Sequence, residues 1–222
     1  RSTLFPYTTL FRSSDEYGVE RYQSVPLYDV TQTDKMLRYG RDGWLVKIPD
    51  SDTTELVRVQ GVSFEGEYLV PNRYLKPWGN TIRFTKVVVV DVTNQHVALL
   101  EKQGNTWNIL SKNPATTGVH KPPYAQETPT GLFAIQQKKE KMYYQQDGSS
   151  QIAGYAPYAS RFTNGAYIHG VPVQLPRKNI IEYSASLGTT PRSHMCVRNA
   201  SSHAKLVFER ATVKESVVLV ID

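Results

Sequence analysis

The sequence contains one cysteine, Cys196, among its 222 residues. A single thiol cannot form a disulfide within the chain, and it excludes a zinc site built from several cysteines. Long apolar runs are also missing, because the longest, residues 87–90 and 217–221, fall far short of the roughly 18 residues that a membrane span needs. With 14 glycines and 13 prolines, the chain is neither collagen-like nor of low complexity. The composition predicts a soluble globular protein of one or two domains.

The net charge gives little information about partners. The chain carries 26 Lys and Arg against 20 Asp and Glu, a formal net charge of +6. Residues 1–13, RSTLFPYTTLFRS, resemble translated sequencing-adapter read-through, so we expect them to lie outside the fold. Removing Arg1 and Arg12 lowers the net charge from +6 to +4. Because no basic stripe with interleaved aromatic residues is present, nucleic acid is not predicted as a partner.

Residues 15–80 form a first block of short polar–apolar alternations separated by turn residues. Five short strands at spacings of about 8–12 residues predict a small antiparallel barrel. The segments GWLVK, residues 43–47, and GEYLVPNRYL, residues 66–75, are similar to motifs of bacterial Src-homology-3-like domains. The alternative is a β-rich extension packed on the main domain. The segment PWGN, residues 77–80, marks the expected boundary.

Residues 85–222 form a second block with longer strands. Residues 87–92 and 96–101 flank the turn sequence TNQ and predict a hairpin. One helix is predicted after Asn199, because apolar residues recur at helical spacing over residues 204–211 and Ser201 or Ser202 can cap the first turn. Residues 216–221 close the block as a strand. The expected fold class is therefore mainly β.

Cys196 lies among groups that act on a thiol. The segment SHMCVRN, residues 193–199, places His194 and Arg198 next to it, and the pair His169-Gly170 follows a predicted strand upstream. A thiolate is the nucleophilic form, and at an ordinary pKa of about 8.5 only about 3% is ionised at pH 7. An imidazole, a guanidinium and the start of a helix can each lower that pKa. The pattern predicts a reactive cysteine instead of a small buried apolar one.

These residues resemble the signature of bacterial L,D-transpeptidase catalytic domains, in which a His-Gly pair precedes a Ser/Thr-His-Gly-Cys-aliphatic-Arg/Asn box. Other segments agree in order: DVTNQHV at 91–97, PATTG at 114–118 and TPTGLFAI at 128–135. The resemblance covers residues 85–222. It implies an L,D-transpeptidase-type β-sandwich with one or two short helices, preceded here by the small barrel-like domain.

Met195 stands where the family usually has glycine between the histidine and the cysteine. A position that needs a positive φ would strain a methionine. We expect instead that the backbone N–H of Met195 faces the oxyanion while its side chain points away, without a positive φ.

The resemblance implies a cysteine acyltransferase that acts on peptidoglycan stem peptides. Cys196 would attack the third residue of a tetrapeptide stem, release the terminal D-alanine and form a thioester. His169 would be the base, oriented by the carbonyl of Gly170. Ser193 and His194 would position the acyl group, and the N–H groups of Met195 and Cys196 would hold the oxyanion. Arg198 would help ionise Cys196 or bind a substrate carboxylate, and a structural salt bridge is the alternative.

The resemblance does not decide which nucleophile accepts the acyl group. An amine of a second stem peptide, a lysine of a wall-anchored protein, or water could resolve the thioester, and water would make the protein an L,D-carboxypeptidase. The family implies a location outside the cytoplasm of a bacterium, in the periplasm or cell wall, with an export signal that this fragment lacks. No cofactor and no metal are predicted, because His96, His120 and His203 lack ligand spacing.

A Gly- and Ser-interrupted segment precedes the strand of His169 and carries Tyr143, Tyr144, Tyr155 and Tyr158. It is a candidate lid over the substrate, and a surface loop with its aromatic rings packed inward is the alternative.

Two rival classes of function remain. Papain-like wall hydrolases place cysteine before histidine, the reverse of the order here. Sortases share the order His169, Cys196, Arg198, but their cysteine lies in a TL-x-T-C strand and their arginine well downstream, and neither feature is present. A non-catalytic wall-binding protein is the alternative that Met195 suggests.

Overall fold

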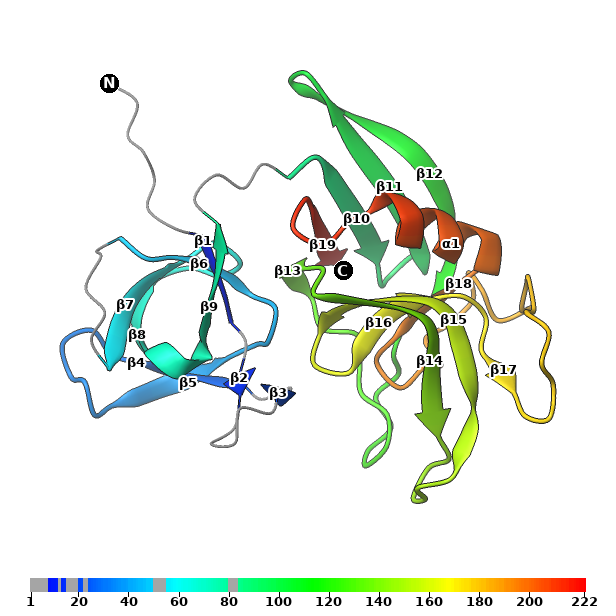
Figure 1. Ribbon diagram of the computed structural model, residues 1–222, viewed down its shortest axis with the longest axis horizontal. Helices are drawn as coiled ribbons and strands as arrows, with labels where there is room; N and C mark the ends of the chain where they lie inside the picture. Colours follow the sequence, from blue (N-terminus) through cyan, green and yellow to red (C-terminus); the bar gives the residue numbers. More distant parts are fainter. Residues whose placement is uncertain (1–7, 12, 15–19, 22–23, 50–54, 80–83) are drawn as a thin grey trace. The chain divides into compact units, whose positions relative to one another are not determined.

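The computed structural model describes residues 8–11, 13–14, 20–21, 24–49, 55–79 and 84–222. They fall into two compact units, residues 1–83 with Leu132–Ala134, and residues 84–131 with 135–222. Strands dominate both units in Figure 1, which confirms the mainly β class. The described residues contain one α-helix, α1 (Ser201–Arg210), and one 3-10 helix, η1 (Asn72–Tyr74). None of their helices has the length and apolar character needed to cross a membrane.

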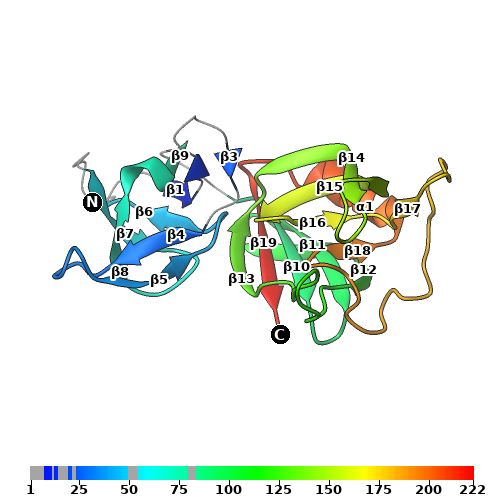
Figure 2. The ribbon, with the colours of Figure 1, turned by 90° about the horizontal axis from the view of Figure 1, so that it is seen from below.

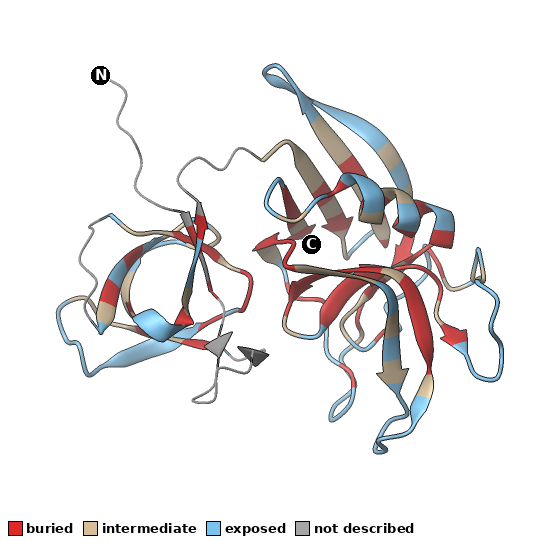
Figure 3. Cartoon of the chain, in the orientation of Figure 1, coloured by how far each residue is buried: buried red, intermediate tan, exposed pale blue. Residues whose placement is uncertain are grey.

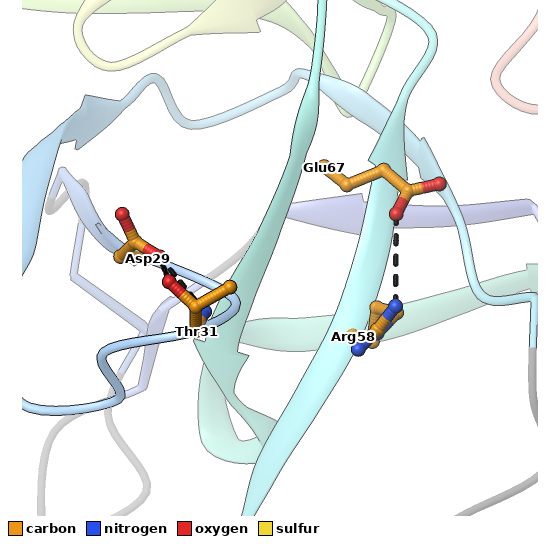
Figure 4. A network of polar contacts seen from close by, with 4 residues as sticks. All are labelled: Asp29, Thr31, Arg58 and Glu67. Carbon is orange, nitrogen blue, oxygen red and sulfur yellow. Dashed lines mark hydrogen bonds and ion pairs between the residues drawn. The ribbon is translucent and has the colours of Figure 1, made fainter.

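The first unit is an antiparallel sheet with the strand order β5-β4-β8-β7-β6-β1-β9. Its strands are β1 (Thr8–Phe11), β4 (Val25–Tyr28), β5 (Met36–Gly40), β6 (Leu45–Lys47), β7 (Leu56–Gly61), β8 (Glu67–Pro71) and β9 (Leu75–Gly79), and the short strands β2 (Ser13–Ser14) and β3 (Glu20–Arg21) pair separately. The polar contacts of this unit lie on its turns and strands, as Figure 4 shows. Asp29 accepts hydrogen bonds of 2.7 Å from the N–H and hydroxyl of Thr31, and Arg58 on β7 lies 3.8 Å from Glu67 on β8.

Strand β1 differs from the expectation for residues 1–13. Thr8–Phe11 pairs with both β6 and β9, and the Phe11 side chain is fully buried in the core of the first unit. These four residues are therefore part of the sheet. Residues 1–7 and 12 of the expected leader lie outside the described residues, as do 15–19, 22–23, 50–54 and 80 of the block 15–80. The likeness of this unit to Src-homology-3-like domains stays a prediction.

The second unit is built on a mixed sheet with the strand order β19-β10-β11-β12-β18-β16-β15-β14, in which β17 also pairs with β15. Its strands are β10 (Lys86–Asp91), β11 (His96–Gln103), β12 (Thr106–Thr116), β14 (Gln137–Gln145), β15 (Ile152–Thr163), β16 (Ala166–His169), β17 (Val173–Gln174), β18 (Val197–Asn199) and β19 (Ser216–Ile221). Gly131, the first residue of β13 (Gly131–Ala134), belongs to this unit, and Leu132–Ala134 belong to the first. The predicted hairpin, helix and closing strand are confirmed as β10–β11, α1 and β19.

Helix α1 packs against β15, β16 and β18, and Figures 1 and 2 both show it beside these strands. Of the four predicted apolar positions, Ala204 and Val207 of the helix and Ala211 directly after it are buried, and Phe208 is partly buried. The expected cap is wrong, because the residue before the helix is Ala200 and no side chain of the helix caps its first turn.

A residue from the loop that follows β17 takes over the capping role. The Glu182 carboxylate accepts hydrogen bonds from the backbone N–H and the hydroxyl of Ser202, with N···O distances of 3.0 and 3.3 Å. A carboxylate at a helix N-terminus satisfies free N–H groups and favours the helix dipole. The loop is therefore tied to the start of the helix.

Candidate active site

Two short parallel strands bring the predicted residues together. β16 pairs with β18 in the register Ile168↔Val197 and His169↔Arg198. Because partners in a parallel ladder project to the same face of the sheet, the side chains of His169 and Arg198 lie side by side. Cys196 comes directly before β18, with its sulfur 3.6 Å from the carbonyl oxygen of Gly165. The strands β15 and β16 beside it are almost wholly buried (Figure 3).

The His169 imidazole is buried and held in one orientation. Its Nδ1 lies 2.6 Å from the carbonyl oxygen of Gly170, the contact expected from the sequence. A neutral ring donates from Nδ1 there, which leaves the lone pair of Nε2 free to accept a proton. Burial lowers the pKa of His169 to about 4, with the Gly170 carbonyl acting in the opposite direction and the Arg198 charge adding to the decrease. Near pH 7 the ring is therefore neutral, which is the form that can accept a proton.

The thiol of Cys196 differs from the expectation. Burial raises the pKa of Cys196, and this effect outweighs the opposing effects of the Tyr167 backbone N–H and the Arg198 charge. The prediction of a lowered pKa is therefore wrong for the unliganded site. At rest the thiol of Cys196 and the imidazole of His169 are therefore both neutral.

Backbone contacts fix the loop that carries Cys196. The Ser193 hydroxyl donates to the carbonyl of Cys196. The Thr128 hydroxyl donates to the carbonyl of Met195 and accepts from the N–H of Gly118, both at 2.8 Å. In a trans peptide the N–H points opposite to the carbonyl, so the N–H of Cys196 points away from Thr128.

Gly118 is needed for this arrangement. A Cβ at Gly118 would lie 2.7 Å from the Cα of Met195 and 2.3 Å from the carbonyl oxygen of Gln126. Both contacts are with backbone, which cannot move aside easily. The segments around Gly118, Thr128 and Met195 can therefore approach each other only because residue 118 has no side chain.

Met195 has a φ of 119°. This lies in the region that glycine adopts without cost and other residues avoid, so the expectation of an ordinary φ is wrong. A strained residue of this kind costs roughly 1–3 kcal/mol and persists only where its surroundings hold it. The bonds of Ser193 and Thr128 on either side supply that hold.

His194 contacts the turn between β14 and β15. Its Nε2 lies 3.1 Å from a carboxylate oxygen of Asp147, and about half of each side chain is exposed. An exposed pair of this kind contributes at most about 1 kcal/mol. Asp147 was not predicted as a site residue, although Asp147-Gly148 is a turn signal.

The four candidate lid tyrosines lie on a hairpin of paired strands, β14 and β15, and not on an irregular loop. Tyr155 is buried and donates to the carbonyl of Lys178 at 2.7 Å, and the exposed Tyr143 packs on its ring. Tyr158 packs on Phe208 of α1. Burial raises the pKa of Tyr144, and the Arg198 charge acts in the opposite direction.

The Arg198 charge acts on three titratable groups of the site. It adds to the decrease in the pKa of His169 and opposes the increase that burial causes in the pKa values of Cys196 and Tyr144. None of the ion pairs among the described residues involves it, and its Nε is buried without a hydrogen-bond partner there. The alternative of a structural salt bridge is therefore not found in the described part of the chain.

Replacing Met195 by glycine tests the strain at this position. We expect Met195→Gly to raise the free energy of unfolding of the second unit by about 1 kcal/mol, because it removes the penalty of a positive φ. Thermal unfolding followed by calorimetry measures the change. Met195→Ala keeps a Cβ and serves as the control, so equal stability of the two variants would contradict the strain.

Titration of His169 tests the effect of burial. We expect its imidazole to stay neutral until the pH falls to about 4. The unfolded chain takes up this proton near pH 6.5, so the contribution of His169 to stability is complete above about pH 6.5 and is lost as the pH falls to about 4. An NMR titration gives the midpoint, which should rise in Arg198→Gln. A midpoint near 6.5 in the unmodified protein would overturn the assignment.

Comparison with solved structures gives several matches of low identity. An L,D-transpeptidase from Mycobacterium smegmatis is 18% identical, with 80% of this chain and 82% of that chain covered and a TM-score of 0.48. One from Mycobacterium tuberculosis H37Rv is 17% identical, with 89% and 76% covered and a TM-score of 0.45. A fused Zn-dependent amidase/peptidase/peptidoglycan-binding domain-containing protein from Clostridium acetobutylicum is 16% identical over 64% of this chain, with a TM-score of 0.44, and the chain spans 55% of its length.

Comparison with family models assigns the second unit. No curated protein matches the chain. The family model of the L,D-transpeptidase catalytic domain, YkuD, matches residues 85–220. Since this match spans more than half of the chain, the protein belongs to the L,D-transpeptidase catalytic-domain family.

Proposed function

We propose that this protein is a peptidoglycan L,D-transpeptidase that forms a thioester between Cys196 and a tetrapeptide stem, and then transfers the acyl group to an amine. The observation that carries the proposal is the pairing of β16 with β18, which sets a neutral, oriented His169 beside the segment of Cys196. Membership of the family supports stem peptides as the substrate class and a location outside the cytoplasm of a bacterium.

In the first step the Cys196 sulfur bonds to the carbonyl carbon of the third residue of the stem. Because both partners are neutral at rest, the thiol proton passes to Nε2 of His169 as the sulfur attacks. The bond between the carbonyl carbon and the nitrogen of the terminal D-alanine then breaks. His169 returns the proton to that nitrogen, and D-alanine leaves as a neutral amine.

The oxyanion of the tetrahedral intermediate is stabilised by backbone N–H groups of the 195–196 segment. Thr128 holds the carbonyl of Met195, and this turns the N–H of Cys196 the other way. Removing one such donor from an enzyme typically costs about 100- to 1,000-fold in kcat. Ser193 supports this geometry by holding the carbonyl of Cys196.

In the second step an amine attacks the thioester carbon and the bond from that carbon to the sulfur breaks. His169 takes the proton that the amine loses and returns it to the sulfur, which restores the thiol. Water in place of the amine gives the L,D-carboxypeptidase reaction. A lysine of a wall-anchored protein would give a protein linked to the wall. The chemistry at Cys196 and His169 is the same in each case, so the acceptor is decided by which nucleophile reaches the thioester.

The non-catalytic alternative depends on Met195. The backbone at Met195 has the positive φ that a glycine would adopt there. The loop therefore keeps the conformation that the usual glycine favours, although methionine stands in its place. This supports an active enzyme over a wall-binding protein that has lost its activity.

A defined disaccharide-tetrapeptide provides the test. We expect mass spectrometry to show release of D-alanine and a cross-linked dimer, both lost in Cys196→Ala and slowed at least about 100-fold in His169→Gln, which cannot act as the base. Tyr183→Phe, an exposed position on the loop after β17, should leave the rate unchanged. A hydrolysed tripeptide without dimer identifies the carboxypeptidase, and products that persist in Cys196→Ala contradict the proposal.

A further inference from the structure

Three polar residues at the junction of β18 and α1 are buried. Asn199 ends β18, and Ser201 and His203 lie in the first turn of α1. Asn199 is fully buried, and the other two are almost fully buried. Buried polar side chains are stable only where they make hydrogen bonds, so the partners of these three show what the junction holds in place.

A network of hydrogen bonds runs from Ser111 through His203 and Asn199 to the main chain of His169. Nδ2 of Asn199 donates to the carbonyl oxygen of His169 at 3.1 Å. Oδ1 of the same amide lies 3.1 Å from Nδ1 of His203, and Nε2 of His203 lies 2.8 Å from the hydroxyl oxygen of Ser111 on β12. The Ser111–His203–Asn199 network therefore joins β12 and α1 to the strand of the proposed base.

The chemistry of the groups gives this network one direction. The carbonyl of His169 can only accept, so Asn199 presents its NH₂ group there and its carbonyl oxygen to His203. His203 must then donate from Nδ1, which leaves Nε2 of a neutral ring to accept from Ser111. Burial lowers the pKa of His203 and so favours the neutral ring. Replacing Nδ1 of His203 as a donor would therefore disturb Asn199.

The peptide group between His169 and Gly170 is held at both ends. Its carbonyl accepts from Asn199, and its N–H donates to the carbonyl of Pro157 at 2.9 Å. Because a peptide group is planar, hydrogen bonds at its two ends fix its rotation. Asn199 therefore helps to set the backbone from which the imidazole of His169 projects.

Ser201 holds the next peptide group, between Gly170 and Val171. The carbonyl of this group accepts from Nδ1 of His169, and its N–H donates to the Ser201 hydroxyl at 3.1 Å. The same hydroxyl donates to the carbonyl of Ile181 at 2.6 Å. A Cβ at Gly170 would lie 2.6 Å from the hydroxyl oxygen, so glycine is needed for this approach. The Ser201 hydroxyl is thus used to hold the loop after β16.

We infer that Asn199, Ser201 and His203 are positioning residues that hold the imidazole of His169 in the orientation in which it takes the thiol proton. Asn199 and Ser201 act on the two peptide groups beside the imidazole. His203 acts on Asn199, and Ser111 completes the network. The inference rests on the proposed function, in which His169 is the base, and it adds the start of α1 to the parts of the fold on which that reaction depends.

NMR of the isotope-labelled full chain tests the positioning without turnover. We expect both His203 and His169 to be protonated at Nδ1, with the Nδ1–H of His169 protected from exchange by its bond to Gly170. Asn199→Asp cannot donate to the carbonyl of His169, so the Nδ1–H of His169 should exchange at least about tenfold faster. A proton on Nε2 of His203, or an unchanged exchange rate in Asn199→Asp, would overturn the inference.

Two substitutions of His203 separate positioning from packing. The amide nitrogen of asparagine takes the place of Nδ1 and can donate to Asn199, whereas that of glutamine takes the place of Nε2 and cannot. We expect His203→Gln to lower kcat roughly 10- to 100-fold with KM within about twofold, because a displaced base slows the chemical step. His203→Asn should keep kcat within about threefold. Asparagine leaves the larger cavity, so a role in packing alone would give the opposite order.

A second pair of variants and a double variant are the controls. His120→Asn and His120→Gln change an exposed histidine and should leave kcat unchanged. Adding His203→Gln to Asn199→Asp should lower kcat no further, because both changes break the same network. Equal kcat in the two His203 variants, or losses that add, would count against the inference. If the unmodified protein releases no D-alanine, the proposed function fails, and the exchange of the His169 Nδ1–H still decides whether the network orients this ring.

Discussion

The site depends on the parallel pairing of β16 with β18. Each strand is only a few residues long, and the two lie far apart in the sequence. The register His169↔Arg198 sets the proposed base beside the cation, and the proposed nucleophile Cys196 comes directly before β18. The surrounding structure maintains this register, because Asn199 donates to the carbonyl of His169 and α1 packs against both strands. A slip by one residue would turn these side chains to the opposite face of the sheet.

Burial decides how the site works. It keeps His169 neutral with a pKa of about 4, raises the pKa of Cys196 and leaves the Arg198 charge without a carboxylate among the described residues. A site with a preformed thiolate would react with many electrophiles. In the proposed mechanism a neutral thiol needs a substrate that brings its carbonyl to the sulfur, because His169 takes the thiol proton only as the sulfur attacks.

The sequence predicted the residues of the site better than their environment. Cys196, His169 and Arg198 could be predicted because their order and the residue types next to the cysteine are visible in the sequence. The positive φ of Met195 and the raised pKa of Cys196 could not be predicted from the sequence, because they arise from contacts with Thr128 and from burial by distant strands. The cap by Glu182 and the position of Tyr144 across Gly154 likewise depend on segments that meet only in the folded chain. The strands β10, β11 and β19 followed directly from local pattern.

The central claim is that Cys196 is the nucleophile of this protein. Intact-mass spectrometry after incubation with a carbapenem tests it most directly, because an activated thiol opens the β-lactam ring and keeps the drug as a thioester. The protein should gain the mass of one drug molecule, peptide mapping should place the adduct on Cys196, and Cys196→Ala should gain none. No mass change in the folded protein, or an adduct that persists in Cys196→Ala, would contradict the account.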